Sequence, residues 1–441
     1  MVATTFFALS RLQNPPHIEC DRCNVILMTV EVVRTDHLGI NGYARNTSPN
    51  INNFFNDGYV FKNAFVSAPN TLPSHMSIFT GLYPSHHKVI NPSPNLNILS
   101  DDIITLPEIL KLYGYKTAAF VSNKPQLNPV FGFGRGFDEY TKSDFVANIT
   151  NLYNFINSSK NEKFFLFINN DYAHDPYVLP PPYDTVFDKD YKGKIIGNEI
   201  KFDNLVRQSG VDYHNSTAVR DFWWSFVNES DPKDVNHVIA LYDGEIYEVD
   251  SFFGDFIHYL KSLNILNKTI IIFSSGSGEE FYEHGGWSHG LMYDEQIHVP
   301  LLIYVPNSAH ATVNDQVGNF DIFPTILSIL GIPHAQNIDA RDLQFLMENP
   351  GTNDPYQVLY LEYQFQNGVR TPQWKLIKTI NGTTTYEFFN LKNDPNEKNN
   401  LDGKYPVDEN YLKDILNTFE TSLNSSFIDV KYINTKYIGY P

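Results

Sequence analysis

Short, continuous apolar segments rich in β-branched and aromatic residues recur along the chain, and they restrict its fold more than any other feature. They occupy residues 24–33, 58–65, 116–122, 164–169, 269–273 and 299–305. A segment that is apolar at nearly every position suits a strand buried on both faces of a parallel sheet. Stretches with helical spacing separate these segments. The alternation over residues 24–333 therefore predicts a doubly wound, mainly parallel α/β sheet.

Helices are predicted from apolar residues at intervals of three and four. They are expected at residues 48–56, 102–112, 235–263 and 320–330. Residues 184–232 show no clear periodicity and are expected to be irregular, with an aromatic-rich part that shapes the mouth of a pocket. Further along, residues 358–364, 374–380 and 385–390 are typical of antiparallel strands, and a terminal helix is expected near 409–423. The predicted organisation is an N-terminal extension (1–23), an α/β domain (24–345) and a C-terminal subdomain (346–441).

The chain is acidic, with a formal net charge of −18 over 441 residues. Such a field repels nucleic acid and anionic membranes, so an anionic ligand would need local positive charge. There is no apolar span of membrane-crossing length, and residues 1–12 make a poor signal peptide. Asn-x-Ser/Thr sequons, which occur by chance in Asn-rich chains, begin at Asn46, Asn148, Asn157, Asn215, Asn228, Asn267, Asn381 and Asn424. Localisation, cytoplasmic or secreted, is left open.

Two cysteines, Cys20 and Cys23, form a C-x-x-C pair just before the first predicted strand. A structural zinc site needs four ligands and usually two such pairs. A redox motif normally opens a helix after a strand, whereas this pair precedes a strand. The sequence therefore predicts a local disulfide or two free thiols.

The segment PNTLPSHMSIFTGLYP, residues 69–84, combines a hydroxyl with a predicted helix start. Thr71 is placed where an extended segment gives way to a helix that Gly81 ends. Unpaired backbone N–H groups at such a place favour an anion, for example a phosphate or sulfate ester. An ordinary Ser/Thr cap with proline in the first turn explains the same residues.

Several motifs in one order resemble the sulfatases of the alkaline phosphatase superfamily. The matching segments, within residues 24–402, are NVILMTVEVVRTDHLGINGY, TLPSHMSIFTGLYPSHH, FGFGRGFDEY, YAHDPYVLPPPY, GEEFYEHGGWSHGLMYDEQIHVPLLIYVP, DIFPTILSILGIP and WKLIKT…YEFFNLKNDPNEKNNL. The resemblance implies a large parallel-sheet domain, a smaller C-terminal antiparallel sheet, and an active site around one divalent metal, usually calcium. It also implies a nucleophile made from Cys or Ser by conversion to formylglycine, or an unmodified Ser or Thr in relatives that handle phosphate.

Carried over to this chain, the resemblance puts Thr71 at the nucleophile position. Threonine cannot become formylglycine, although a Thr alkoxide can attack phosphorus if it is stabilised. His75 stands where the family has Arg, which gives a weaker and pH-dependent positive charge. His174 and His289 match positions that contact the ester oxygens and the leaving group. Each of these histidines taken alone is as well explained by a structural role.

The metal positions depart from the family pattern. Glu31 replaces the first Asp, Val32 follows it, and Gly276 and Ser277 replace a later Asp-His or Asp-Asn pair. Calcium takes about six to eight oxygens, several of them charged. Glu31 among neutral groups is expected to bind metal weakly. Restoring the pair with Gly276→Asp and Ser277→His is expected to create metal affinity. The acids in the same motif, Glu279, Glu280 and Glu283, also occur in the family beside its metal ligands.

Two functions follow as hypotheses. In the first, the chain keeps the sulfatase fold but lacks the metal, has little or no activity, and binds an anionic or glycan ligand or a protein partner. In the second, it is an ester hydrolase of the phosphodiesterase type with Thr71 as nucleophile and His174 and His289 assisting. No cofactor is expected in the first case, and calcium or another divalent metal in the second. Without a metal, the barrier rises by several kcal/mol, at about 1.4 kcal/mol per tenfold in rate.

Overall fold

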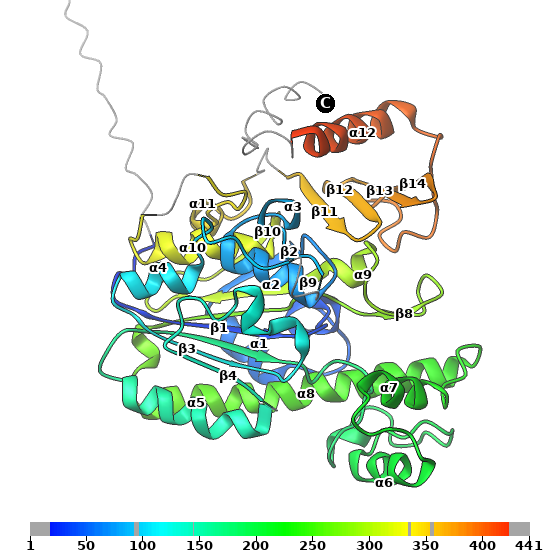
Figure 1. Ribbon diagram of the computed structural model, residues 1–441, viewed down its shortest axis with the longest axis horizontal. Helices are drawn as coiled ribbons and strands as arrows, with labels where there is room; N and C mark the ends of the chain where they lie inside the picture. The colour runs from blue at the N-terminus through cyan, green and yellow to red at the C-terminus, as the bar shows by residue number, and fades with distance from the viewer. Residues whose placement is uncertain (1–17, 92–96, 144, 334–336, 353–356, 423–441) are drawn as a thin grey trace, which may run out of the picture.

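A large mixed sheet forms the centre of the protein (Figure 1). The structure is a computed structural model that describes residues 18–91, 97–143, 145–333, 337–352 and 357–422. The sheet has eight strands in the order β10-β2-β9-β6-β1-β5-β3-β4. Its strands are β1 (Asn24–Val30), β2 (Tyr59–Phe65), β3 (Lys116–Val121), β4 (Glu139–Lys142), β5 (Phe164–Asn170), β6 (Thr269–Ser274), β9 (His298–Tyr304) and β10 (Ala311–Gly318). Strand β9 runs antiparallel to β2 and β6, and the other neighbours are parallel, which confirms a mainly parallel sheet.

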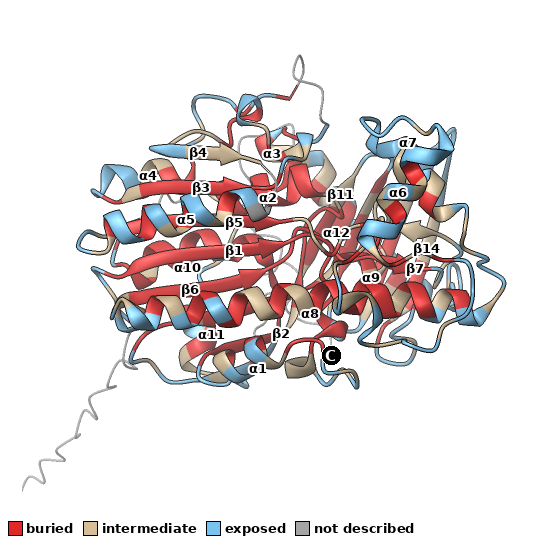
Figure 2. Ribbon diagram, turned by 90° about the horizontal axis from the view of Figure 1, so that it is seen from below, coloured by how far each residue is buried: buried red, intermediate tan, exposed pale blue. Residues whose placement is uncertain are grey.

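Helices cover both faces of this sheet. The covering helices are α1 (Pro49–Phe55), α2 (Thr71–Thr80), α4 (Leu106–Leu112), α5 (Phe145–Ser159), α8 (Pro232–Ser262), α10 (Ile322–Ile329) and α11 (Gln344–Glu348). The short helices α3 (Pro84–His87) and α9 (Asp294–Ile297) lie outside these two layers. Because side chains of a strand alternate between faces, Val25 and Leu27 join the core under α2, α4, α10 and α11. Ile26 and Met28 join the core under α1, α5 and α8. The central strands β1, β5 and β6 are buried along their length, whereas the edge strand β4 is not (Figure 2).

The predicted C-terminal antiparallel sheet is confirmed, with one strand more than expected. It is a meander of β11 (Leu359–Tyr363), β12 (Gln366–Arg370), β13 (Trp374–Asn381) and β14 (Thr383–Asn390), and α12 (Pro406–Ser422) packs on it. Lys375 of β13 is fully buried and pairs with Asp294 at 2.9 Å and Glu397 at 2.8 Å. Arg370 also pairs with Asp294, at 2.6 Å. The segment that follows β6 is thereby tied to the second sheet.

The prediction that residues 184–232 are irregular was wrong in part. Helices α6 (Glu199–Ser209) and α7 (Ser216–Trp224) lie there, beside one end of the large sheet (Figure 1). Each begins at an asparagine, Asn198 or Asn215, whose side chain accepts a backbone N–H of the first turn. Trp223 is fully buried, and its indole N–H donates to the Ile196 carbonyl at 2.9 Å. Both helices are short and each buries few apolar residues, so the helical periodicity of the sequence was too weak to predict them.

Cys20 and Cys23 form a disulfide, one of the two predicted states. Of the sequons, Asn148 is 1% exposed and its amide donates to the Val121 carbonyl, so the folded protein offers no access to that side chain. Asn424 lies outside the described residues. Among the described helices, none combines the length and apolar character needed to cross a bilayer.

Candidate functional site

Thr71 is the first residue of α2, at the carboxyl-end edge of the large sheet. Asn70 is the N-cap and its side chain accepts the N–H of Leu72. Thr71 is 8% exposed and lines a cavity of about 390 Å³. His174 and His289 line the same cavity, as does Glu31. The structure therefore brings together residues that the sequence predicts as a site from four distant segments. Open α/β sheets place ligands at this edge.

Glu31 receives two hydrogen bonds from uncharged groups. It directly follows β1, is 2% exposed, and accepts the Thr71 hydroxyl through Oε2 at 2.9 Å. Its Oε1 accepts the Asn169 amide at 2.6 Å. Asn169 lies on β5, whose parallel pairing with β1 sets it beside Thr29. The carboxylate is thus held by the predicted nucleophile and by Asn169, and its Oε1 also lies 3.4 Å from Nε2 of His75.

His75 completes this hydrogen-bond network. Its Nδ1 is 2.9 Å from the Thr71 carbonyl, which can only accept, so Nδ1 carries a proton. Its Nε2 is 3.0 Å from Thr29 Oγ1, which also accepts the Asn169 amide at 3.1 Å, and 3.4 Å from Glu31 Oε1. Ser122 donates to the side-chain amide oxygen of Asn169 at 3.0 Å. These contacts join Glu31, Thr71 and His75 into one buried network.

Gly276 lies against His75 and Glu31. A Cβ atom at position 276 would stand 2.5 Å from His75 Cε1 and 2.8 Å from Glu31 Oε2, closer than van der Waals contact allows. The imidazole and the carboxylate therefore occupy the space that a side chain at 276 would need. The neighbouring Ser277 is fully buried, and its hydroxyl has no hydrogen-bond partner in the described structure.

We tested whether these residues fit the divalent metal that the fold implies. The described side chains at the predicted metal positions offer one carboxylate, Glu31, and two hydroxyls, Thr71 and Ser277. Val32 is buried in the apolar core on the α8 face and supplies no donor. Calcium takes about six to eight oxygens with several charges. This donor set does not fit.

A separate acidic triad lies on the segment after β6. Glu280, His284 and Glu295 bring one ligand atom each within 4.8 Å of one another. Glu280 already accepts the backbone N–H groups of His284 and Gly286, both at 2.8 Å, and His284 contacts Glu295 at 2.6 Å. None of the three lines the cavity beside Thr71. These contacts brace the loop that connects the hairpin strands β7 (Glu280–Phe281) and β8 (Trp287–Ser288).

His174 is the cavity's cationic histidine. Its ring lies 5.3 Å from that of His289, edge to face, and its Nδ1 is 2.9 Å from Asp175 Oδ1. Burial alone would lower the pKa of His174, but the hydrogen bond and charge of Asp175, with a smaller contribution from Glu279, raise it to about 9. Burial raises the pKa of Glu279. His289, whose Nδ1 is 3.4 Å from the Glu279 carboxylate, offsets part of this rise. The cavity thus holds a positive group beside Thr71 at neutral pH.

Two further cations line the cavity and were missed by sequence reasoning. Lys124 lies 3.3 Å from Asp171, and Arg220 of α7 lies 4.0 Å from Asp175. Their side chains are 41% and 39% exposed. Lys124 comes three residues after the carboxyl end of β3, and this position could have indicated a residue of the site. No sequence pattern indicated Arg220, since the helix that carries it was not predicted.

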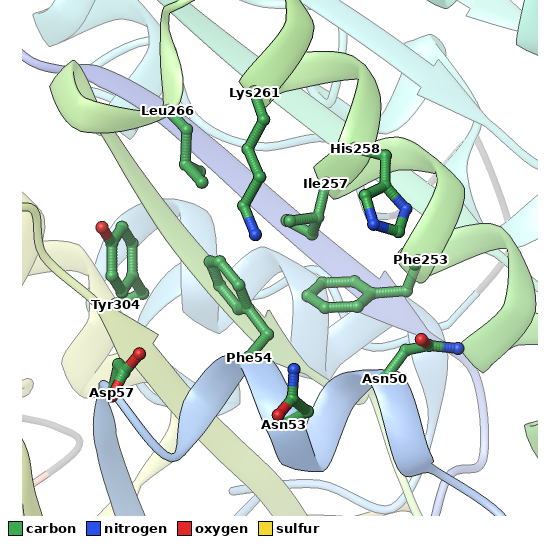
Figure 3. Close-up of a pocket in the computed structure, with 11 residues that line it drawn as sticks. Asn50, Asn53, Phe54, Asp57, Phe253, Ile257, His258, Lys261, Leu266 and Tyr304 are labelled. Atoms are coloured by element: carbon green, nitrogen blue, oxygen red, sulfur yellow. The ribbon is translucent and has the colours of Figure 1, made fainter.

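Another cavity, of about 190 Å³, lies between α1 and α8 (Figure 3). Lys261 of α8 reaches toward Phe54 of α1, and Asp57 and Tyr304 stand at one end. Asp57 precedes β2 and Leu266 precedes β6, so this cavity is at the amino-end edge of the parallel strands. None of the predicted site residues lines it.

Residues 23–332 match the Sulfatase family, over more than half of the chain. The chain belongs to the sulfatase family. Residues 282–425 of the chain also match the C-terminal region of N-sulphoglucosamine sulphohydrolase. The Sulfatase match puts the chain among the sulfatases of the alkaline phosphatase-like superfamily, which generally use a divalent metal.

Curated relatives of the chain are named as sulfatases. Arylsulfatase K of Bos taurus is 26% identical over 412 residues, covering 81% of this chain and 74% of the relative. N-acetylglucosamine-6-O-sulfatase of Bacteroides thetaiotaomicron is 24% identical over 480 residues, covering 90% of this chain and 86% of the relative.

Solved structures share the fold. One, in complex with its substrate D-glucosamine-2-N,6-O-disulfate, superposes with a TM-score of 0.75 at 20% identity and covers 91% of this chain and 98% of its own. The phosphonate monoester hydrolase of Agrobacterium radiobacter gives 0.71 at 19% identity, with 91% and 96% covered.

Proposed function

We propose that this sulfatase-family protein binds the sulfate or phosphate ester of a glycan beside Thr71 without a divalent metal, and that it hydrolyses the ester slowly or not at all. The packing at Gly276 carries the proposal, because His75 and Glu31 fill the space where a second metal-binding carboxylate would lie. Both carboxylate oxygens of Glu31 and both ring nitrogens of His75 have partners within the protein, so these groups are satisfied without a metal ion.

Three cations support an anionic ligand. His174, Lys124 and Arg220 line one cavity in a protein whose net charge is −18. The same cavity is lined by the acids Glu31, Asp171 and Asp175, and the three cations supply the local positive charge that an anion needs in an acidic protein. Sulfated sugars are the ligand class named for the relative N-acetylglucosamine-6-O-sulfatase and for the structure solved with a disulfated glucosamine.

A second candidate function is ester hydrolysis through Thr71, favoured by the 2.9 Å contact between Thr71 Oγ1 and Glu31 Oε2. Glu31 would accept the Thr71 proton as Oγ1 attacks phosphorus, and His174, as the imidazolium, would protonate the departing alkoxide. Water would then release phosphate from Thr71. A base at hydrogen-bond distance from a hydroxyl is the geometry this step needs.

Thermal unfolding with added ions tests the metal-independent site. Calcium, magnesium, manganese or zinc at millimolar concentration should leave Tm unchanged relative to EDTA, since the described residues beside Thr71 do not form a metal site that would stabilise the fold by mass action. Glucosamine 6-sulfate should raise Tm under both conditions. A rise with one metal that Glu31→Gln abolishes would contradict the proposal.

Turnover separates the two candidates. With nitrophenyl sulfate, phosphate and phosphodiester substrates, we expect the wild type to match Thr71→Ala, while Thr71→Ser tests whether a hydroxyl at this place suffices. Wild-type turnover that Thr71→Ala loses and Thr71→Ser keeps would establish the hydrolase instead. Binding of glucosamine 6-sulfate by calorimetry in all three proteins shows that the cavity is intact.

A further inference from the structure

A second, more open cavity of about 570 Å³ adjoins the cavity beside Thr71. The two share the residues Asp175, Arg220, Ser288 and His289. A ligand whose ester lies beside Thr71 can therefore extend past Arg220 into the second cavity without leaving a continuous surface. The volume exceeds what one ester group fills.

Two tryptophans line this second cavity and a tyrosine packs beside one of them; the three rings are here called the aromatic shelf. Trp224 of α7 and Trp287 of β8 lie 4.5 Å apart at an angle of 40°, and Tyr282 lies 5.7 Å from Trp287 at 33°. Trp224 and Trp287 are half-buried, and Tyr282 is 37% exposed. Trp224 and Trp287 therefore present aromatic surface to the cavity, and Tyr282 extends the cluster on the side of Trp287.

The shelf is held in place before any ligand arrives. The Trp224 indole N–H donates to Asp175, and its ring packs 5.0 Å from the fully buried Trp223. Asp175 in turn contacts His174 of the ester cavity at 2.9 Å. One carboxylate therefore fixes both the ester-binding histidine and the first ring of the shelf. Preorganised groups lose little entropy on binding.

Charged groups border the shelf. Arg220, Asp221 and Glu229 line the same cavity as Trp224 and Trp287. A sugar ring has apolar C–H faces and hydroxyl groups at its edge, so aromatic faces bordered by hydrogen-bonding side chains match it. Two of the three bordering groups are acids, which accept hydroxyl protons and repel a second sulfate. The occupant that fits is an uncharged hexose ring.

We propose that the aromatic shelf is a second sugar subsite, so that the ligand is an oligosaccharide with its ester at one end and an uncharged ring on Trp224 and Trp287. This inference rests on the proposed ester-binding function and deepens it. The single ester-bearing sugar then occupies only the inner cavity. The adjoining ring adds contacts that a monosaccharide cannot make.

Calorimetry with two ligands tests the subsite. The first is N-acetylglucosamine 6-sulfate, and the second is a disaccharide in which galactose is attached to that same sulfated sugar. We expect the disaccharide to bind at least about tenfold more tightly, the size of effect that a good aromatic contact supplies. Its binding should also quench tryptophan fluorescence, and a second sulfate on the galactose should weaken it.

Variants locate the effect. Trp287→Ala should reduce the disaccharide-to-monosaccharide affinity ratio to about one, and Tyr282→Ala, at an exposed position, should lower it without a large change in packing. Trp374→Phe is the matched control, since Trp374 stacks on Phe388 in the second sheet at 4.9 Å, and should leave the ratio as in the wild type. Equal affinity for the two sugars in the wild type would overturn the subsite alone. Absence of binding by both would overturn the proposed function.

Discussion

Replacing Gly276 with aspartate should destabilise the protein and should not create a metal site. The sequence pattern alone suggests the opposite, because aspartate is the family's residue there. In the structure the new Cβ would collide with His75 and Glu31, and the new carboxylate would be buried beside an existing one. Overpacking costs about 1–3 kcal/mol and an unpaired buried charge several more. Chemical denaturation should show a loss of about 3 kcal/mol or more.

Companion variants separate bulk from charge at this position. Gly276→Ala adds only the methyl group and should cost less than Gly276→Asp. Combining Gly276→Asp with His75→Ala removes the ring in the way, and should recover stability and make Tm rise with added calcium. If Gly276→Asp by itself were as stable as the wild type, the packing argument for a metal-independent site would be wrong.

His174→Gln should remove most of the affinity for an anionic ester. Glutamine keeps a hydrogen-bonding side chain but has no charge, and it leaves Asp175 with the more distant Arg220, at 4.0 Å, as its cation. Losing one partner of a buried charged contact costs roughly 2 kcal/mol or more in binding, which is about thirtyfold in Kd. Titration with glucosamine 6-sulfate at pH 7 measures it. An unchanged Kd would show that His174 does not contact the ester.

The pH dependence gives the same residue an independent test. The pKa of His174 is raised from 6.5 to about 9, so the contact with Asp175 contributes its full stability below about pH 6.5 and loses it as pH rises through 9. The contribution is roughly 2–3 kcal/mol at pH 6 to 7. The wild type should lose stability and ester affinity between about pH 8 and 10. His174→Gln should show neither loss.

Much of the fold follows from residue patterns. Strand β1 and its neighbours are apolar on both faces, which few structures other than a covered parallel sheet can bury, and α8 has a long, regular apolar stripe. Helices α6 and α7 escaped prediction because each buries only one or two large side chains, such as Trp223, so their periodicity is short. Strand β12 was missed because Gly368 and polar residues interrupt its alternation.

The sequence identified several residues of the candidate site but not how they pack together. The order of motifs identified Glu31, Thr71, His75, His174 and His289. The structure places four of them along one cavity, and the fully buried His75 contacts Thr71 and Glu31. The sequence could not show that His75 packs where a side chain at 276 would stand, because that contact joins residues 201 positions apart. Nor could it reveal Arg220, which reaches the cavity only through the way α7 packs by Trp223 and Trp224.

The buried contacts of Lys375 have a practical consequence for anyone wishing to trim this protein. Asp294 belongs to the same segment as Gly276, Glu279 and His289, and it is anchored by Lys375 and Arg370 of the second sheet. Cutting the chain near residue 346 would leave Asp294 exposed to solvent and the cavity wall unsupported. The large-sheet domain and the smaller sheet should therefore be expressed as one protein. Loss of ligand affinity in a truncated variant would not locate the ligand-binding site.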